Sequence, residues 1–211
     1  GGAVTDGNDT DYINFLLPGI LAQTALFGAI QTGVGLAEDL SKGVIDRLRS
    51  LPIARYAVLA GRTVADAVRN TFVIALMSSV GFLLGFRFQE GLGKFLFAAG
   101  LVVLFAYAFS WVSAVIGMLL KDSETVQVAG FLWVFPMVFA SSVFVPVQTM
   151  PDWLQVFARN QPVTQVVNAV RHLTQGNVPD GSTYIWITLL WVVGIIAVFA
   201  PIAVWRYRKI Q

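Results

Sequence analysis

Residues 95–120 read FLFAAGLVVLFAYAFSWVSAVIGMLL, which is 26 residues without a single Asp, Glu, Lys or Arg. An α-helix rises about 1.5 Å per residue, so about 20 apolar residues cross a bilayer hydrocarbon core about 30 Å thick. The stretch is long enough to cross. It therefore predicts a membrane-spanning helix.

The rest of the 211-residue chain has the same character: 12% of residues are charged and 56% are hydrophobic. A soluble domain has about 25% charged residues and about 45–50% apolar residues. Further spans are predicted at residues 12–37, 64–86, 126–146 and 184–205. We expect an all-α, polytopic transmembrane helix bundle, with one domain over residues 1–211 and five spans.

The charges around these spans predict their orientation, because Lys and Arg near span ends are retained on the cytoplasmic side. One side carries nine: Lys42, Arg47, Arg49, Arg55, Arg62, Lys121, Arg206, Arg208 and Lys209. The other side carries four: Arg87, Lys94, Arg159 and Arg171. We expect a cytoplasmic C-terminus and an external N-terminus. Residues 1–11 show no signal that would export them, so an upstream first span is expected to precede this fragment.

No ionisable residue lies in the middle of an expected span, which weighs against a self-powered, ion-coupled carrier. Asp66 and Arg69 begin the span at 64–86, and we expect them to snorkel to the headgroups. Gln23 and Gln31 are polar residues in the first span that could line a translocation path, although such residues more often serve helix packing.

Several chemical functions are excluded by the composition. Gly93-Lys94 lacks the first Gly and the Ser or Thr of a phosphate-binding loop, so the chain is not expected to hydrolyse ATP by that route. With no Cys and one His, we expect no catalytic residues, no metal site and no bound cofactor. The basic residues lie in short loops rather than on one face, which argues against a nucleic-acid partner.

The cytoplasmic loop after the first span carries a short amphipathic pattern. Leu40, Val44, Leu48 and Leu51 recur at helical spacing, and Pro52 ends the helix. Two interpretations stay open. The helix either lies on lipid headgroups, which its arginines attract, or docks its apolar face into a groove on a cytoplasmic partner.

The external stretch at 147–183 predicts two short helices joined at residues 160–162. The second has an apolar stripe at i, i+3, i+4 and i+7, formed by Val163, Val166, Val167 and Val170. The pair either lies at the outer interface, with Trp153 as an anchor, or dips back as a re-entrant hairpin covered by protein.

Two blocks of sequence carry a family resemblance. The first comprises AEDL at 37–40, GVIDRLRSLP at 43–52 and AVLAGR at 57–62. The second comprises FVP at 144–146, TMPDWL at 149–154, QPVT at 161–164 and AVR at 169–171. In this order, with spans between them, they resemble the permease subunits of ABC type-2 exporters, specifically the daunorubicin-resistance-type drug permeases.

The resemblance implies a six-span subunit in the bacterial plasma membrane that exports a small hydrophobic or amphipathic substrate, such as a drug, antibiotic or lipid-like metabolite. It implies a second permease copy, a homodimer in the simplest case, and a separate ABC ATP-binding subunit that holds ATP and Mg. It assigns coupling to that subunit to Leu40, Gly43, Val44, Arg47, Leu48, Arg49, Leu51 and Pro52. It assigns an external gate hairpin to Pro151, Trp153, Pro162 and Arg171.

Two rival functions stay open. An exporter of lipid-linked glycan or polysaccharide uses the same architecture, and substrate-stimulated ATPase activity would distinguish it. A membrane scaffold without transport belongs to another class, and it would not need to copurify with an ATPase.

Overall fold

The computed structural model describes residues 9–42, 55–176 and 178–209, and these residues form helices and no β-strand. In chain order the elements are α1 (Asp9–Ser41), α3 (Arg55–Leu83), α4 (Leu92–Leu120), α5 (Ser123–Phe139), the 3₁₀ turn η1 (Val147–Thr149), α6 (Asp152–Asn160), α7 (Pro162–Gln175) and α8 (Gly181–Lys209). The all-α prediction is confirmed.

Four of these helices are long and apolar enough to cross a membrane: Tyr12–Ser41, Gly61–Leu83, Leu92–Leu120 and Gly181–Tyr207. They coincide with four of the five spans predicted from the sequence.

The fifth expected span, at 126–146, is shorter than predicted. α5 ends at Phe139, and its 17 residues extend about 25 Å, less than a hydrocarbon core of about 30 Å. The chain then turns through residues 140–145. Hydropathy alone cannot separate a helix from a buried apolar turn, because both exclude water.

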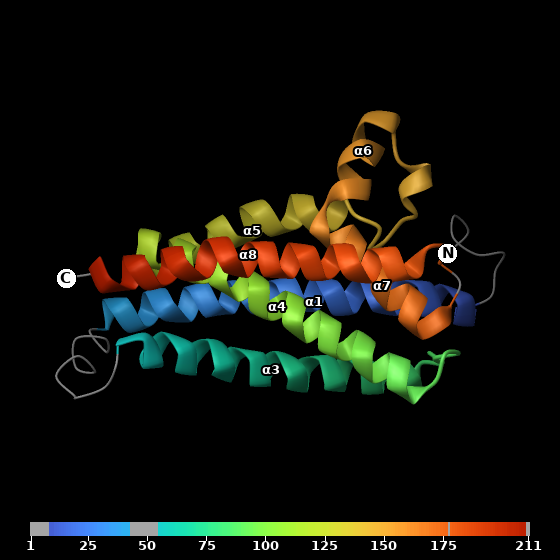
Figure 1. Ribbon diagram of the computed structural model, residues 1–211, viewed down its shortest axis with the longest axis horizontal. Helices are drawn as coiled ribbons and strands as arrows, with labels where there is room; N and C mark the ends of the chain where they lie inside the picture. Colours follow the sequence, from blue (N-terminus) through green and yellow to red (C-terminus); the bar gives the residue numbers. More distant parts are fainter. Residues whose placement is uncertain (1–8, 43–54, 177, 210–211) are drawn as a thin grey trace.

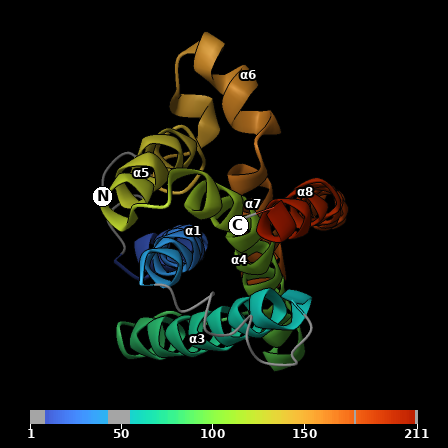
Figure 2. The same ribbon diagram turned by 90° about the vertical axis from the view of Figure 1, so that its left-hand side faces the viewer.

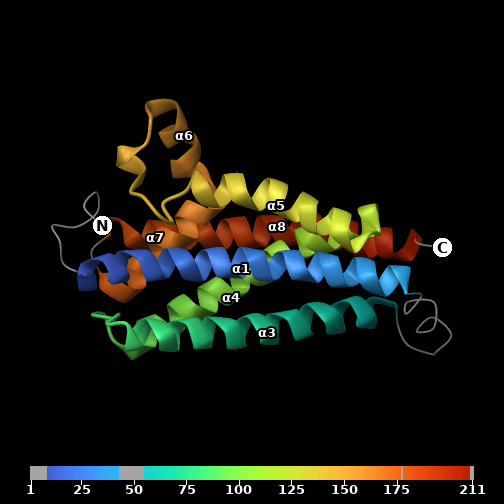
Figure 3. The same cartoon turned by 180° about the vertical axis from the view of Figure 1, so that it is seen from behind.

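The long helices run side by side, α4 crosses the bundle obliquely, and α6 projects from it near one end (Figures 1 and 3). α1 is the central helix, and it packs against α3, α4, α5 and α7. Seen along the bundle, α1 lies between α5 and α3, with α8 on the far side of α4 (Figure 2). The outer surface of α1 is therefore bordered by two other helices.

Small residues allow α1 and α4 to approach closely. A Cβ added to Gly33 would overlap the Ser113 backbone, and one added to Gly117 would overlap the Gly33 backbone. Ala22 and Ala29 of α1 are fully buried. In lipid, where apolar surface gains little from burial, such close packing is a main source of helix association.

Candidate functional site

α7 closes one end of the bundle. Its valine stripe, Val163, Val166, Val167 and Val170, is buried. The helix packs against α1, α4 and α8, so protein covers it as the re-entrant interpretation requires. The predicted joint at 160–162 is also confirmed: Pro162 occupies the first turn, where its missing N–H costs no hydrogen bond.

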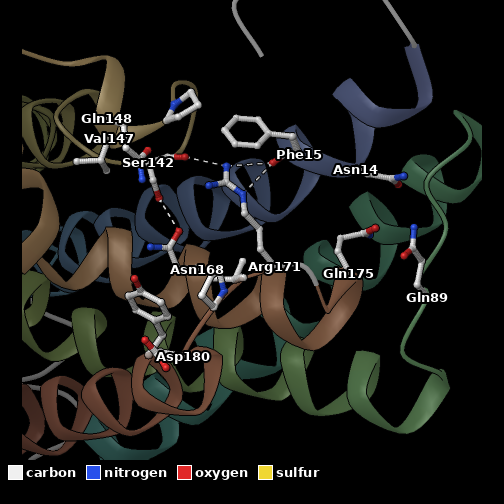
Figure 4. Close-up of a pocket in the computed structure, with 14 residues that line it drawn as sticks. Asn14, Phe15, Gln89, Ser142, Val147, Gln148, Asn168, Arg171, Gln175 and Asp180 are labelled. Atoms are coloured by element: carbon white, nitrogen blue, oxygen red, sulfur yellow. Dashed lines mark hydrogen bonds between the residues drawn. The ribbon is translucent and has the colours of Figure 1, made fainter. Parts of the chain in front are cut away.

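Arg171 of α7 ties three segments together (Figure 4). Its Nε and Nη2 donate to the carbonyl oxygen of Phe15 in α1, at 3.2 and 3.0 Å. Nη2 also donates to the carbonyl oxygens of Ser142 and Val143, at 2.7 and 3.4 Å, in the turn after α5. The guanidinium carbon lies 3.7 Å from the centre of the Phe15 ring, within cation–π range.

The charge of Arg171 is held deep in protein, since only 6% of the residue is exposed. Desolvation by burial lowers the pKa of Arg171 to about 9, so the side chain is still cationic at neutral pH. Carbonyl oxygens are the negative ends of peptide dipoles. The cation therefore holds the turn after α5 against α1 and α7.

Amide and hydroxyl side chains complete this junction. Gln161 Nε2 donates to the carbonyl oxygens of Met137 and Ala140, at 2.9 and 2.6 Å, which satisfies carbonyls left unpaired at the end of α5. The Ser142 backbone N–H donates to Thr164 Oγ1 at 3.2 Å. α5 ends where it does because α7 supplies these partners.

A cleft of about 570 Å³ opens beside Arg171. Asn14, Phe15, Gln89, Ser142, Pro146, Val147, Gln148, Asn168, Arg171, Gln175, Val178, Pro179, Asp180 and Tyr184 line it. Polar side chains from α1, α7 and the loops meet there, as Figure 4 shows. Gln175 Nε2 donates to the Arg87 carbonyl at 3.1 Å, which fastens the α3–α4 loop to α7.

The predicted gate residues divide into two groups. Pro162 and Arg171 are buried in α7. Pro151 precedes α6, and Trp153 is 76% exposed on that projecting helix. The structure therefore brings only the α7 pair into the polar end of the bundle.

The two glutamines predicted for the path lie on one stripe of α1. Gln31 is exposed, Gln23 is half-buried, and Phe27 lies between them at a spacing of four residues from each. The Phe27 ring contacts Phe131 and Phe135 of α5, with centroid distances of 5.9 and 5.8 Å. This α1–α5 face, defined here as Gln23, Phe27, Gln31, Phe131 and Phe135, combines amide and aromatic groups.

Asp66 and Arg69 bond within the protein, contrary to the prediction that they snorkel to the headgroups. Asp66 is buried, with 7% of the residue exposed. Arg69 Nη2 donates to the carbonyl oxygen of Gly28, about halfway along α1, at 3.1 Å. Near the end of α1, Arg62 forms an ion pair with Asp39. Arg69 and Arg62 therefore bond with polar groups on α1, and Asp66 pairs with Arg69. Because Gly28 lies near the middle of the apolar stretch Tyr12–Ser41, the expectation that every span has an uncharged middle is wrong for α3.

Comparison with known proteins decides the family. A family model described as ABC-2 type transporter matches residues 2–174. The chain belongs to this family. It is 33% identical over 209 residues to the daunorubicin resistance ABC transporter permease protein DrrB1 of Streptomyces coeruleorubidus, covering 99% of this chain and 73% of that protein. It is 32% identical over 196 residues to the probable doxorubicin resistance ABC transporter permease protein DrrC of Mycobacterium tuberculosis, covering 92% of this chain and 69% of that protein.

A more distant relative is the probable multidrug ABC transporter permease YbhR of Escherichia coli, 24% identical over 166 residues and 78% of this chain. The resemblance inferred from the two sequence blocks is therefore confirmed. The chain is a multi-pass membrane protein of the ABC-2 permease type, homologous to drug-resistance permeases.

The coupling residues predicted for this ABC-2 permease lie outside the described residues, with one exception. Residues 43–54 are not among those that the structure describes, and this segment contains Gly43, Val44, Arg47, Leu48, Arg49, Leu51 and Pro52. Leu40, at the end of α1, is half-buried and packs against a cluster that includes Leu36, Met118 and Tyr207. The coupling assignment stays a prediction.

Sequence reasoning missed the roles of Gln161, Asn168 and Gln175 in the polar end of the bundle. The available signal was their position on a helix predicted to be covered by protein, because a buried amide needs a partner. That signal could not identify the partners, because the carbonyls that Gln161 satisfies lie 21 and 24 residues away in the chain.

Proposed function

We propose that this chain is the membrane-spanning permease subunit of an ATP-driven ABC exporter. It moves a hydrophobic or amphipathic substrate, such as a drug, antibiotic or lipid-like metabolite, out of the cell. The membership of the ABC-2 family and the relatives named for daunorubicin and doxorubicin resistance support this proposal.

The α1–α5 face is the observation that carries the proposal. An exposed amide in a membrane-spanning helix is unfavourable against lipid tails, because they offer it no hydrogen bond. Gln31 is exposed at this face, and next to it Phe27 presents a ring for an apolar or aromatic body. A surface with both features suits an amphipath, and a second permease copy would enclose it.

The energy would come from a separate ABC ATP-binding subunit that carries ATP and Mg. In this proposal the segment around residues 40–51 docks into that subunit on the cytoplasmic side. Closure of two ATPase subunits then moves α1 and α3, the helices on either side of the segment. Differential contacts in the two states are required, since a partner that binds both states equally shifts neither.

Transport in vesicles tests the proposal. The permease, coexpressed with its ATPase, should give ATP-dependent uptake of fluorescent amphipaths into inside-out vesicles, and an ATPase variant that cannot hydrolyse ATP should not. Phe27→Ala should raise the KM for uptake, while Leu190→Ala, at a residue 70% exposed on α8, should leave it unchanged. Equal effects of both substitutions would contradict the assignment of the α1–α5 face.

The docking segment has its own test. Val44→Asp with Leu48→Asp should abolish export and copurification of the ATPase while the permease still inserts into the membrane. Export at the wild-type rate would refute this docking assignment. Stimulation of the ATPase by polyprenyl-linked sugars, and not by hydrophobic drugs, would identify a glycan exporter instead.

A further inference from the structure

The register between α1 and α3 places the Arg69 cation near the middle of the membrane-spanning part of α1. Three contacts fix this antiparallel register: Leu17 with Gly81, Gly28 with Asn70, and Gly35 with Arg62. Arg69 Nη2 reaches the Gly28 carbonyl within this register. Gly28 lies near the middle of Tyr12–Ser41, the part of α1 that is long and apolar enough to cross a membrane.

The Arg69 side chain is not enclosed by the bundle. It is 46% exposed, whereas the side chain of its ion-pair partner Asp66 is 10% exposed. An exposed cation at mid-depth is strongly disfavoured against lipid tails, so such residues face a bundle interior or a water-filled cavity. Gln31, one turn of α1 from Gly28, is exposed as well.

Buried polar atoms near Arg69 also indicate that water reaches the boundary between α1 and α3. Thr32 Oγ1, Asp66 Oδ2 and Asn70 Nδ2 have no hydrogen-bond partner among the described residues. The three residues are each at least nine-tenths buried. Buried polar atoms are nearly always satisfied by protein or ordered water, so water is expected to reach this boundary.

Arg69 also has hydrogen-bonding capacity to spare. Its contacts with the Gly28 carbonyl, at 3.1 Å, and with Asp66 Oδ1, at 3.3 Å, both use Nη2. Within the described part of the chain, nothing pairs with Nε or Nη1. A guanidinium presents its donors in a planar fork that matches the oxygens of a phosphate or carboxylate.

We propose that Arg69 binds the anionic headgroup of an exported amphipath, such as a phosphate, at a hydrated α1–α3 boundary. This inference rests on the proposed function and narrows its substrate class. The apolar tail would lie on the adjacent α1–α5 face, since Gln31 and Phe27 are on the same side of α1. Asp66 neutralises part of the Arg69 charge, so that the headgroup is held and still released.

Cysteine labelling tests hydration, and the natural chain contains no Cys that would interfere. In the assembled transporter in vesicles, Gln31→Cys should react with a membrane-impermeant sulfonate thiol reagent at least about tenfold faster than Val68→Cys, since the reagent modifies only the hydrated thiolate. Val68 neighbours Arg69 on α3, is 65% exposed and serves as the matched control. Equally slow or equally fast labelling of the two positions would overturn the hydrated boundary.

Headgroup selectivity tests the role of Arg69. Three amphipaths with the same fluorescent tail and a phosphate, hydroxyl or trimethylammonium head are compared in ATP-dependent uptake. Arg69→Gln should raise the KM for the phosphate compound about tenfold or more, as expected for loss of a charge-assisted hydrogen bond, and leave the hydroxyl compound unchanged. Arg69→Lys should restore part of the selectivity, and Arg159→Gln, on α6, should change nothing.

The outcomes separate the two proposals. An equal loss for all three compounds in Arg69→Gln would mean that Arg69 only positions the helices, and a wild-type preference for trimethylammonium would exclude an anionic substrate. Either result overturns this inference and leaves an ATP-driven exporter in place. If the wild-type transporter moves none of the three compounds or any fluorescent drug with ATP, the proposed function itself is refuted.

Discussion

Arg171 and Arg69 are two cations in a predominantly apolar bundle, and each donates to a backbone carbonyl of α1. Arg171 contacts the carbonyls of Phe15, Ser142 and Val143 and lies over an aromatic ring. Arg69 contacts one carbonyl and one carboxylate through a single nitrogen, and its side chain is 46% exposed. Arg171 is almost completely buried at the edge of a cleft, whereas nearly half of the Arg69 side chain is exposed.

This difference separates a structural cation from one that can bind a ligand. A buried charge that donates to several backbone carbonyls stabilises the surrounding backbone. A half-exposed charge with unused donors contributes little to stability, because water already solvates it. The exposed fraction and the number of backbone carbonyls bound therefore predict opposite consequences for the same kind of substitution at the two positions.

The largest effect is expected for Arg171→Ala. Removing the guanidinium leaves the carbonyls of Phe15, Ser142 and Val143 without a shared donor, and breaking such a buried network costs about 3–5 kcal/mol. The thermal unfolding midpoint in detergent should fall sharply, and the yield of folded permease should fall with it.

Arg171→Lys keeps the charge but loses the planar fork, so an intermediate loss is expected. Arg159→Ala serves as the control, since the Arg159 side chain donates to Gln155 Oε1 on the exposed side of α6. An unfolding midpoint for Arg171→Ala equal to that of the control would show that the enclosed cation is not structural.

A pair of glycines on α1 gives the next largest effect. A Cβ on Gly19 would overlap the Val143 backbone at the Arg171 end, whereas one on Gly28 would meet the side-chain amide of Asn70 at the Arg69 end. Backbone cannot give way as a side chain can, so Gly19→Ala should cost about 1–3 kcal/mol. Gly28→Ala should be nearly neutral, because Ala has the better helix propensity.

The same denaturation assay compares the two glycine variants directly. Equal destabilisation would mean that the Arg69 end is packed as rigidly as the Arg171 end. The distinction between an enclosed and an open end would then be lost.

The sequence predicted this architecture unevenly, and the reasons are physical. The valine stripe of α7 was predicted correctly because Val163 to Val170 report a local periodicity that burial follows. The end of α5 was predicted wrongly, because the residues that bind it and the following turn are distant in the sequence: Gln161 donates to carbonyls at the end of α5, and Arg171 donates to carbonyls of the turn. The depth of Arg69 was missed for a related reason: it depends on the α1–α3 register, which becomes visible only when the two helices are paired.

A smaller loss is expected for Gln161→Ala, which belongs to the enclosed end. Gln161 Nε2 satisfies the carbonyls of Met137 and Ala140, and leaving buried carbonyls unpaired costs about 1–3 kcal/mol. Gln155→Ala is the matched control, because that amide also donates to a backbone carbonyl, at Met150, but close to the surface of α6. If the two variants unfold at the same temperature, Gln161 does not secure the end of α5.

The smallest effect on stability is expected for Arg69→Gln, the variant with the largest predicted effect on headgroup selectivity. Glutamine can still donate to the Gly28 carbonyl, and solvent reaches the side chain, so the loss should be about 1 kcal/mol or less. The same unfolding assay as for Arg171→Ala gives the comparison its sharpest form. A destabilisation of Arg69→Gln as large as that of Arg171→Ala would show that both arginines are structural, and it would contradict the proposal that Arg69 binds a ligand.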